Sequence, residues 1–483
     1  MTAVYIVLLC LVGAAALLLA AAVIRTFLIK APERKTASGQ QFTQEVLDGY
    51  AEGLGCLIRI PSVSKRADED LTEFKKLHAQ LEKLFPLVHK TLEKTELDGT
   101  LLFCWRGSDS KRLPVLFMGH QDVVPASDDG WTVPAYSGTV RDGALFGRGA
   151  LDCKCNVYIE LEAIEQLIAQ GFVPPCDVYV EASINEETGG DGAESAVRYL
   201  QRKGIRLALV IDEGGSVIEQ AMPGMDRPYA VIGITEKGYI DLKVTARGKG
   251  GHSSTPPRNT PAARLFAFAN EIEKKRPFAK KLLPEVEEMF AEMAPSFGFG
   301  MKLLLGNVWL FKPLIIAAMP ALSPFGEALL ATTCTFTMMK GSDAPNVIPK
   351  EPYLIANLRT SVQQNCEQSL SVMKKYADKY NLELEVLNQR DASPVASTKS
   401  AEYTYLKECI SAQFPDVGIA PYVIMGGTDC RHFHAVTDNV FRFAPIRMTS
   451  QQLNSCHAID ENITVSAIAE GVEFFKFFLE NYR

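Results

Sequence analysis

Histidine and acidic side chains follow several strand-like segments of this chain. The segments are short apolar or alternating runs, a pattern that predicts buried β-strands. The candidate ligands at their ends are His120 after residues 114–119, Glu186 and Glu187 after 178–185, and Asp212 and Glu213 after 207–211. Asp152 and His457 stand in turns of their own. Because open α/β sheets build their sites at the carboxyl ends of their strands, we expect these side chains to converge in one crevice.

These residue types predict a zinc site. Zn²⁺ accepts imidazole and carboxylate ligands, and a pair of zinc ions needs a bridging carboxylate with further ligands for each ion. Asp152 suits the bridge. Glu186 stands one residue before Glu187 and remains free of metal, so it is placed to take a proton from a metal-bound water, the role of a general base.

Each part of this pattern is weak alone. A single histidine after a strand is more often an ordinary surface or core group, and a pair of glutamates is usually a solvated loop. The prediction therefore depends on the recurrence of such residues at strand ends that are followed by glycine turns.

Five motifs that contain these residues resemble, in the same order, those of the zinc-dependent aminoacylase and carboxypeptidase family. The resemblance runs from about residue 45 to the C-terminus, with motifs at 119–125, 147–152, 185–190, 250–254 and 455–461. It implies an α/β fold, in which a catalytic domain has a mixed, mainly parallel sheet flanked by helices. It also implies an inserted, smaller α/β sandwich that serves as a lid and as a dimerisation domain.

The resemblance assigns roles to the candidate ligands. One zinc would be held by His120 and Asp212, with Glu213 as the alternative to Asp212, the other zinc by Glu187 and His457, and Asp152 would bridge the two. Asp122 would fix the tautomer of His120, a common arrangement around zinc-bound imidazole.

The residue after Asp152 departs from the family pattern, because close relatives carry Asp or Met where this chain has Cys153. Cys153 and Cys155 are an alternative site for a soft metal. Two small buried thiols are the favoured interpretation, since no Cys-x-x-Cys pair completes a thiolate cage. Eleven cysteines in a chain of 483 residues are also too few to indicate a disulfide scaffold, and we expect mostly free thiols.

The spacing of the motifs indicates the domain organisation. Four metal motifs precede residue 215 and the last lies near 457. We therefore expect a discontinuous catalytic domain, 31–236 and 390–483, with the lid inserted at 237–389 and a leader at 1–30.

Four residues resemble the family's substrate-binding groups. His252 resembles the histidine that enters the site of the partner subunit and holds the oxyanion, which implies a homodimer formed through the lid. Arg359 and Asn346 resemble groups that bind the substrate carboxylate and carbonyl oxygen, and a guanidinium suits the former because it binds carboxylate with two hydrogen bonds. A surface salt bridge is the alternative for Arg359. Gly427 would offer a backbone amide.

An apolar segment at 301–322 is longer than a small sandwich needs. One interpretation is core and dimer interface. A transmembrane span is less favoured, because Lys312, Pro313 and Pro320 interrupt the segment. The third interpretation is a hydrophobic surface that accepts an acyl chain or contacts a membrane or lipoprotein particle.

The N-terminus predicts a signal sequence or a signal anchor, because residues 2–24 are uncharged and almost wholly apolar. Its apolar core is long for a cleaved signal, although the alanines at 20–22 suit cleavage. The basic residues that follow favour a cytosolic body by the positive-inside rule, whereas the sequon at 462–464 and the leaders of close relatives favour the lumen. We expect the secretory pathway, with a secreted protein first and a single-pass anchored protein as the alternative.

The combined expectation is an enzyme that hydrolyses amide bonds of small molecules. A net charge of −7 and the lack of a basic patch argue against nucleic acid as a partner. The leader and the apolar segment favour the family members that hydrolyse, and reversibly form, N-fatty-acyl amino acids from a fatty acid and an amino acid. The alternatives are a carboxypeptidase S-like enzyme for short peptides, a cytosolic aminoacylase for short acyl groups, and a catalytically inactive binding protein of the same fold.

Overall fold

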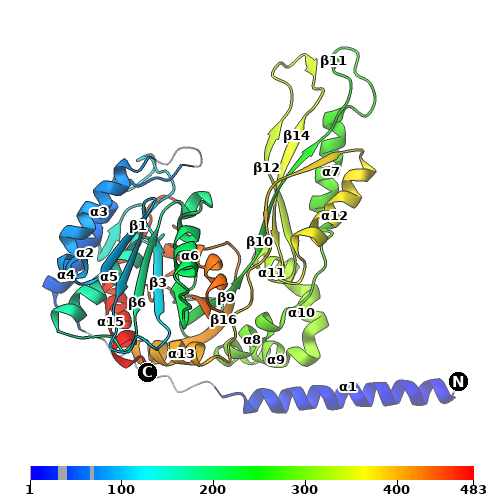
Figure 1. Ribbon diagram of the computed structural model, residues 1–483. Helices are drawn as coiled ribbons and strands as arrows, with labels where there is room; N and C mark the ends of the chain where they lie inside the picture. The colour runs from blue at the N-terminus through cyan, green and yellow to red at the C-terminus, as the bar shows by residue number, and fades with distance from the viewer. Residues whose placement is uncertain (1, 31–40, 66–69) are drawn as a thin grey trace.

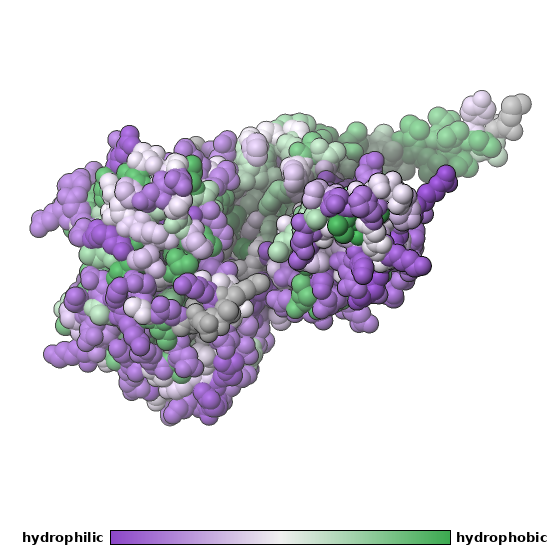
Figure 2. All heavy atoms as spheres, turned by 90° about the horizontal axis from the view of Figure 1, so that it is seen from above, coloured by the Kyte–Doolittle hydropathy of each residue, from purple (hydrophilic) through white to green (hydrophobic). Residues whose placement is uncertain are grey.

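The computed structural model describes residues 2–30, 41–65 and 70–483. Within these residues the chain forms a large body, a smaller sheet that projects from the body, and an N-terminal helix that extends away from both (Figure 1). Seen from above, a hollow separates the body from the projecting sheet (Figure 2).

A ten-stranded mixed sheet forms the centre of the body. Its order is β1 (Glu93–Leu97), β2 (Thr100–Trp105), β6 (Val178–Ser183), β3 (Val115–His120), β7 (Leu209–Asp212), β17 (Val440–Arg442), β9 (Tyr229–Glu236), β8 (Val217–Ile218) and β18 (Arg447–Met448), and β16 (Gly418–Ile424) also pairs with β9. The central pairs β6–β3, β3–β7 and β7–β17 are parallel. The carboxyl ends of these strands therefore meet at one edge.

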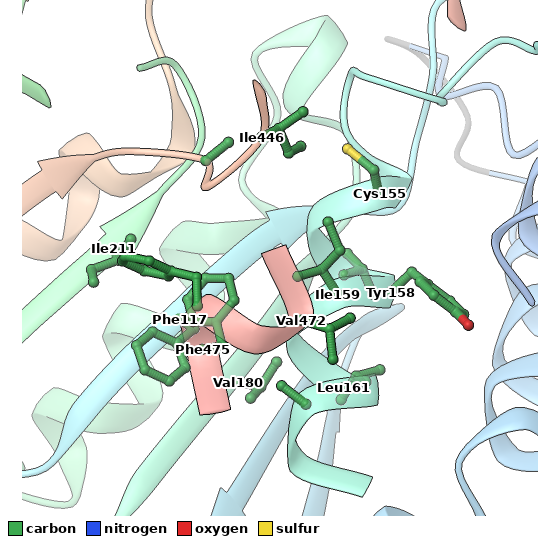
Figure 3. Close-up of a cluster of buried hydrophobic side chains, with 14 of the residues drawn as sticks. Phe117, Cys155, Tyr158, Ile159, Leu161, Val180, Ile211, Ile446, Val472 and Phe475 are labelled. Atoms are coloured by element: carbon green, nitrogen blue, oxygen red, sulfur yellow. The ribbon is translucent and has the colours of Figure 1, made fainter. Parts of the chain in front are cut away.

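Two layers of helices bury the two faces of this sheet, and alternate residues of each strand contact opposite layers. Phe117 and Val180 face α2 (Gln44–Ile58), α5 (Lys154–Ala169) and α15 (Val465–Asn481), where Phe117 packs against Phe475 (Figure 3). Met118 and Tyr179 face α6 (Gly192–Arg202) and η3 (Asp429–Ala435). Because both faces are buried, the central strands β3, β6 and β7 are largely apolar.

The projecting sheet is antiparallel, in the order β12 (Thr333–Lys340), β14 (Tyr353–Thr360), β10 (Gly238–Thr245) and β15 (Glu383–Arg390). Helices α7 (Pro261–Lys275) and α12 (Cys366–Lys379) pack on one face. Buried and half-buried positions alternate along β10, as expected when one face of a strand is covered. A two-stranded ladder, β11 (Gly251–His252) with β13 (Val347–Ile348), lies at the far tip (Figure 1). The predicted α/β fold with a mixed, helix-flanked sheet is confirmed.

Part of the segment between these strands packs on the body. Helices α8 (Pro284–Met293), α9 (Phe299–Gly306), α10 (Val308–Leu322) and α11 (Pro324–Leu330) share a hydrophobic core with β9 and β16. In this core Val286 and Phe290 are buried with Val231 and Ala420. The predicted apolar segment at 301–322 thus forms two helices at the edge of the large sheet.

The other helices and strands are short or peripheral. They are α1 (Thr2–Leu28), α3 (Thr72–Leu84), α4 (Pro86–Thr91), η1 (Glu186–Thr188), η2 (Ala294–Ser296), α13 (Ala401–Gln413) and α14 (Ser450–Leu453), with a three-stranded sheet of β4 (Thr139–Arg141), β5 (Ala144–Phe146) and β19 (Asn462–Thr464). All eleven cysteines are free thiols in the structure.

Candidate metal centre

The structure brings the sequence-predicted ligands together at the carboxyl ends of the central parallel strands. His120 ends β3, and its Nε2 lies 2.8 Å from Asp152 Oδ1 and 3.5 Å from Glu213 Oε1. The His120 side chain is almost fully buried. These three side chains, together with the thiol of Cys153, form the first group that satisfies the spacing of metal ligands.

A second group shares Asp152 with the first. Its members are Asp152, Glu187 and His457. His457 Nε2 lies 2.9 Å from Asp152 Oδ2 and 3.1 Å from Glu187 Oε2. The two oxygens of one carboxylate therefore face two different histidines, which is the placement required of a bridging ligand.

The donor set fits divalent metal ions. Each group combines one imidazole with two carboxylates, the ligands that zinc accepts. Glu187 Oε1 is buried without a hydrogen-bond partner, although its other oxygen contacts His457. The carboxylates of Asp152 and Glu187 raise the pKa of His457 to about 10. The surrounding charge thus favours a cation at this position.

Asp122 contacts members of both groups of candidate ligands but belongs to neither group. Its carboxylate is fully buried and lies 3.3 Å from His120 Nδ1, as expected of a group that orients a ligating imidazole. The same carboxylate accepts hydrogen bonds from the backbone amides of Glu186 (3.2 Å) and Glu187 (3.1 Å). The hydroxyl of Ser64 donates a further hydrogen bond to it. One buried acid therefore fixes a histidine and the turn that carries two glutamates.

Glu461 holds the loop that carries Asp152. Its Oε1 accepts hydrogen bonds from the amides of Gly149, Leu151 and Asp152. Its Oε2 lies 2.5 Å from the guanidinium of Arg148. These partners are more than 300 residues away in the sequence, so the C-terminal motif supplies both the ligand His457 and the clamp on the bridging loop.

The structure places Glu213, rather than the preferred Asp212, in the first group of candidate ligands. Asp212 is buried, and its oxygens accept hydrogen bonds from the amides of Glu213 (2.8 Å) and Cys430 (2.9 Å). Glu213 is the acid beside His120. Successive side chains at a strand end point in opposite directions, so only one of two adjacent acids reaches the crevice. Here that acid is Glu213, and Asp212 binds backbone on the other side.

Glu186 lies in η1, one residue before Glu187. Burial, and then the charge of Asp429, raise the pKa of Glu186 well above that of a free glutamate. Asp429 is itself buried and accepts a hydrogen bond from Ser183. A carboxyl group whose pKa is raised is suited to hold a proton during a reaction.

The two thiols near Asp152 are bound to backbone. Cys153 Sγ lies within ligand spacing of the first group, but it accepts a hydrogen bond from the amide of His120. Cys155 Sγ donates to the carbonyl of Leu151. Burial raises the pKa of both thiols well above the usual value, so neither resembles a thiolate ligand. This favours the interpretation as buried thiols.

His252 and Asn346 lie together, far from the ligands of their own chain. His252 lies in the β11–β13 ladder at the tip of the projecting sheet and Asn346 directly precedes β13, and the amide of Ser253 donates a hydrogen bond to the carbonyl of Asn346. Both side chains are exposed. The structure therefore pairs these two residues but does not bring them to the metal centre of the same chain.

Arg359 lies at the base of the projecting sheet, beside an arginine that the sequence analysis missed. The guanidinium groups of Arg359 and Arg390 lie 4.8 and 5.7 Å from the ring of Tyr239. Within the described part of the chain, neither arginine has a carboxylate at ion-pair distance, which removes the salt-bridge interpretation of Arg359. The Nε of Arg390 is buried without a partner.

Gly427 leaves the space that Arg390 occupies. A Cβ on Gly427 would lie 1.8 Å from a guanidinium nitrogen of Arg390, so a larger residue would displace this end of the Arg390 side chain. Burial, followed by the charge of Arg431, lowers the pKa of Arg390, while Glu236 and Glu186 oppose this effect. Arg390 is the last residue of β15, where the chain re-enters the body. This position beside a domain boundary was the one signal in the sequence that could have indicated it.

Comparisons with known proteins agree with this geometry. Residues 116–481 match peptidase family M20/M25/M40. The chain is 33% identical over 480 residues to the N-fatty-acyl-amino acid synthase/hydrolase of Xenopus tropicalis, an alignment that covers 96% of this chain and 92% of the relative. It is also 33% identical over 424 residues to a probable carboxypeptidase S-like protein of Dictyostelium discoideum, with 86% and 81% of the two chains covered.

Solved structures show the same fold. The M20 family metallo-carboxypeptidase Sso-CP2 of Sulfolobus solfataricus superposes with a TM-score of 0.66 at 18% identity, over 91% of this chain and 99% of the other. Human carnosine dipeptidase 1 superposes with a TM-score of 0.60 at 18% identity, over 90% and 97%.

Proposed function

The chain belongs to peptidase family M20/M25/M40, and from this premise we propose that it is a two-zinc amidohydrolase that hydrolyses, and reversibly forms, N-fatty-acyl amino acids. It is an enzyme that acts on amide bonds. The finer assignment is carried by one observation: the similarity to an N-fatty-acyl-amino acid synthase/hydrolase extends over 96% of the chain.

The zinc ions would be held by the two groups of ligands described above. His120 and Glu213 would bind one ion, Glu187 and His457 would bind the other, and Asp152 would bridge the two ions. The support is that the two groups share Asp152 and no other residue. When bound, two zinc ions supply polarisation of the scissile carbonyl and a lowered pKa for water.

Glu186 is the proton carrier of the reaction. It accepts a proton from the attacking water and delivers it to the nitrogen of the leaving amine. The hydrogen bonds that the Asp122 carboxylate accepts from the amides of Glu186 and Glu187 fix the turn, so that the proton carrier and the neighbouring ligand are oriented together. In the direction of synthesis the same carboxylate takes protons from the nitrogen of the amino acid as this nitrogen attacks the carboxyl carbon of the fatty acid, and it returns them to the departing carboxyl oxygen, which leaves as water.

Arg359 and Arg390 bind the free carboxylate of the substrate. Two guanidinium groups beside one tyrosine ring repel each other unless an anion lies between them. The buried Nε of Arg390 offers such an anion a desolvated donor, which strengthens a charged hydrogen bond. Gly427 leaves room for the side chain of Arg390, and its backbone amide would donate a further hydrogen bond to the substrate carboxylate.

The projecting sheet acts as a lid and dimerisation domain, with the insertion bounded at 237–389. His252 and Asn346 act in the site of the partner subunit, where His252 holds the oxyanion and Asn346 the carbonyl oxygen. The support is their exposed position at the tip, distant from the ligands of their own chain (Figure 1).

The chain enters the secretory pathway through its N-terminal helix. Cleavage of this helix would give a secreted enzyme, and its retention would give a single-pass membrane protein. The sequon at Asn462 lies in β19, where the Asn462 amide donates to Asp460 and accepts from Gln452. This arrangement adds no support for glycosylation.

A carboxypeptidase S-like peptidase is the second candidate. It is favoured by the 33% identity to the Dictyostelium discoideum protein, which equals that of the first relative over a shorter alignment. Both candidates use the same ligands and the same proton carrier, and they differ in what lies on the acyl side of the amide bond.

Competition between substrates tests these assignments. The full chain, zinc-loaded in detergent, is given a long-chain acyl phenylalanine, an acetyl amino acid and a dipeptide in one mixture. We expect the acyl phenylalanine to be cleaved fastest, and cleavage to vanish in Glu186→Gln while Glu194→Gln, an exposed acid on α6, leaves it unchanged. Preference for the dipeptide would replace the proposal by the peptidase, and no turnover of any substrate would indicate a binding protein.

A further inference from the structure

The N-terminal helix has a specific seat on the body. Only two residues of α1 with described side chains are fully buried, Ala22 and Thr26, which lie one turn apart on the same face of the helix. Both contact Asn307, the residue between α9 and α10. The amide nitrogen of Asn307 donates to the carbonyl of Ala22 (3.3 Å) and to the hydroxyl of Thr26 (3.0 Å). Asn307 itself is fully buried.

Close packing surrounds these hydrogen bonds. A Cβ on Gly306 would lie 2.4 Å from Cδ1 of Ile29, the residue just after α1. The rings of Phe27 and Phe299 lie 5.3 Å apart. Small residues at close approach and amide or hydroxyl hydrogen bonds between helices are the features of helix contacts inside membranes.

The rest of α1 projects into surroundings that must be apolar. The segment Ala3–Leu28 has 26 residues and a mean hydropathy of 2.9, and only 6% of its most apolar window is buried. At about 1.5 Å per residue it is roughly 39 Å long, enough to cross a hydrocarbon core of about 30 Å. Figure 2 shows it as an apolar rod that projects from the body. A core helix would be buried, so lipid is the environment that fits this helix.

Helices α9 and α10 present further apolar side chains beside the foot of α1. They meet at an angle of 105°, which places Asn307 at the corner. The exposed large apolar residues on these two helices and on the following helix are Phe299, Met301, Trp309, Leu314, Leu322 and Phe325. Lys312 of α10 is paired with Glu287 of the body. The apolar surface of the body therefore continues that of α1.

We propose that α1 is retained in the mature protein as a transmembrane anchor, and that α9 and α10 dip into the same bilayer around the foot of that anchor. The occupant of this surface is a lipid bilayer. A signal sequence that is removed needs no seat on the folded body, whereas Asn307, Gly306 and Phe299 form one. This proposal is independent of the substrate assigned above.

The mature N-terminus is the first test. The full chain, with a C-terminal tag, is produced in animal cells, and the membranes are washed with alkaline carbonate before the intact mass is measured. We expect the protein in the washed membranes with a mass that includes residues 2–22. A mass that lacks these residues, together with protein in the medium, would overturn the proposal.

The seat of α1 is tested by a double-mutant cycle on the full chain in detergent. Thr26→Val and Asn307→Ala each remove one side of the same hydrogen bond, so we expect the Tm of the double variant to fall by clearly less than the sum of the two single shifts. Leu9→Ala, on the exposed part of α1, is the control and should add to Asn307→Ala without coupling. Additive shifts for Thr26 and Asn307 would show that α1 is not docked.

Contact of α10 with lipid is tested by fluorescence. The full chain is placed in phosphatidylcholine vesicles whose acyl chains carry bromine, which quenches nearby tryptophan. Trp309 is exposed on α10, whereas Trp105 is buried and Trp131 is half-buried in the body. We expect partial quenching that disappears in Trp309→Phe. Equal quenching in both proteins would place α10 outside the bilayer and would overturn this part of the proposal.

Discussion

The ligands at the ends of the body strands and the residues at the lid tip differ in how they are held. His120 and Asp122 are buried and Asp152 is partly buried, and each is fixed by contacts within one chain. His252 and Asn346 are exposed on a two-stranded ladder that extends from the small sheet. Preorganised groups can stabilise charge without the cost of rearrangement. The candidate ligands are thus already held together within one chain, whereas the proposed role of His252 requires a partner subunit.

Loss of the proton carrier Glu186 should give the largest effect on turnover, and it tests the proposed site in the body. Glu186→Gln removes a general base, an effect of about 10² to 10⁴ in rate, and we expect kcat to fall at least about 10³-fold. Metal content, measured by mass spectrometry of the purified protein, should be unchanged because Glu186 is not a ligand. Activity within about tenfold of the parent would contradict the role.

A mixture of two inactive variants tests whether His252 of the lid acts in the site of the partner subunit. His252→Ala removes a donor to the oxyanion, which costs about 10² to 10³ in kcat. If the histidine acts across a dimer, His252→Ala mixed with Glu186→Gln forms one intact site in each mixed dimer, and activity returns. His89→Ala, on the surface helix α4, is the control. Failure to regain activity in dimers shown to be mixed would place His252 in its own site or in none.

Metal content can distinguish Glu213 from Asp212 as a ligand of the metal centre. Glu213→Ala should lower the affinity for one metal ion by roughly 100-fold, at least as much as the loss of a residue that orients a ligand. Metal content should then fall towards one ion per chain. Asp212→Asn should retain both ions, because Asp212 binds backbone amides. Loss of metal from soluble, folded Asp212→Asn together with full metal in Glu213→Ala would reverse the assignment.

Arg390 lies between the two regions and should affect substrate binding more than turnover. A hydrogen bond to a charged group contributes about 1.5 to 3 kcal/mol, so Arg390→Met should raise KM by roughly 10- to 100-fold. Arg390→Lys, which keeps the charge but loses the fork of donors, should recover part of this loss. An unchanged KM for substrates with a free carboxylate would remove Arg390 from the substrate site.

The joint between the two sheets should show the smallest effect, in the pH dependence of stability. Lys237 connects β9 to β10, and its ammonium donates to the carbonyls of Ala328 and Ala331. Burial lowers the pKa of Lys237 to about 7, below the unfolded value near 10.5. Between these values the unfolded chain binds more protons, so this lysine makes stability rise with pH.

Comparison of the parent with Lys237→Met isolates that contribution. From pH 7 to 9 the parent should gain about 1 to 3 kcal/mol in free energy of unfolding relative to Lys237→Met, as measured by urea unfolding. Lys243→Met, on the partly exposed face of β10, should behave as the parent does. Parallel pH profiles for all three proteins would show that Lys237 keeps an ordinary pKa.

The sequence predicted residues that the structure does bring together, namely His120, Asp152, Glu187 and His457, because most of them lie in local motifs near strand ends. It could not distinguish Asp212 from Glu213, since two adjacent acids are equivalent until the direction of each side chain at the strand end is known. Arg390 was missed because no motif surrounds it, and its significance comes from Gly427 and Tyr239, which are distant in sequence. The same holds for Asn307, whose partners Ala22 and Thr26 lie 285 and 281 residues away.

The contacts of Glu461 determine when the loop that carries Asp152 can be fixed during protein synthesis. The loop that carries Asp152 emerges from the ribosome early, but three of its amides await a carboxylate made 310 residues later. His457, four residues before Glu461, arrives at the same time. A nascent chain therefore cannot bring all the candidate ligands together before residues 457–461 are made, and a premature stop between η3 and His457 would leave a protein with the central strands β3, β6 and β7 but without the second group of candidate ligands.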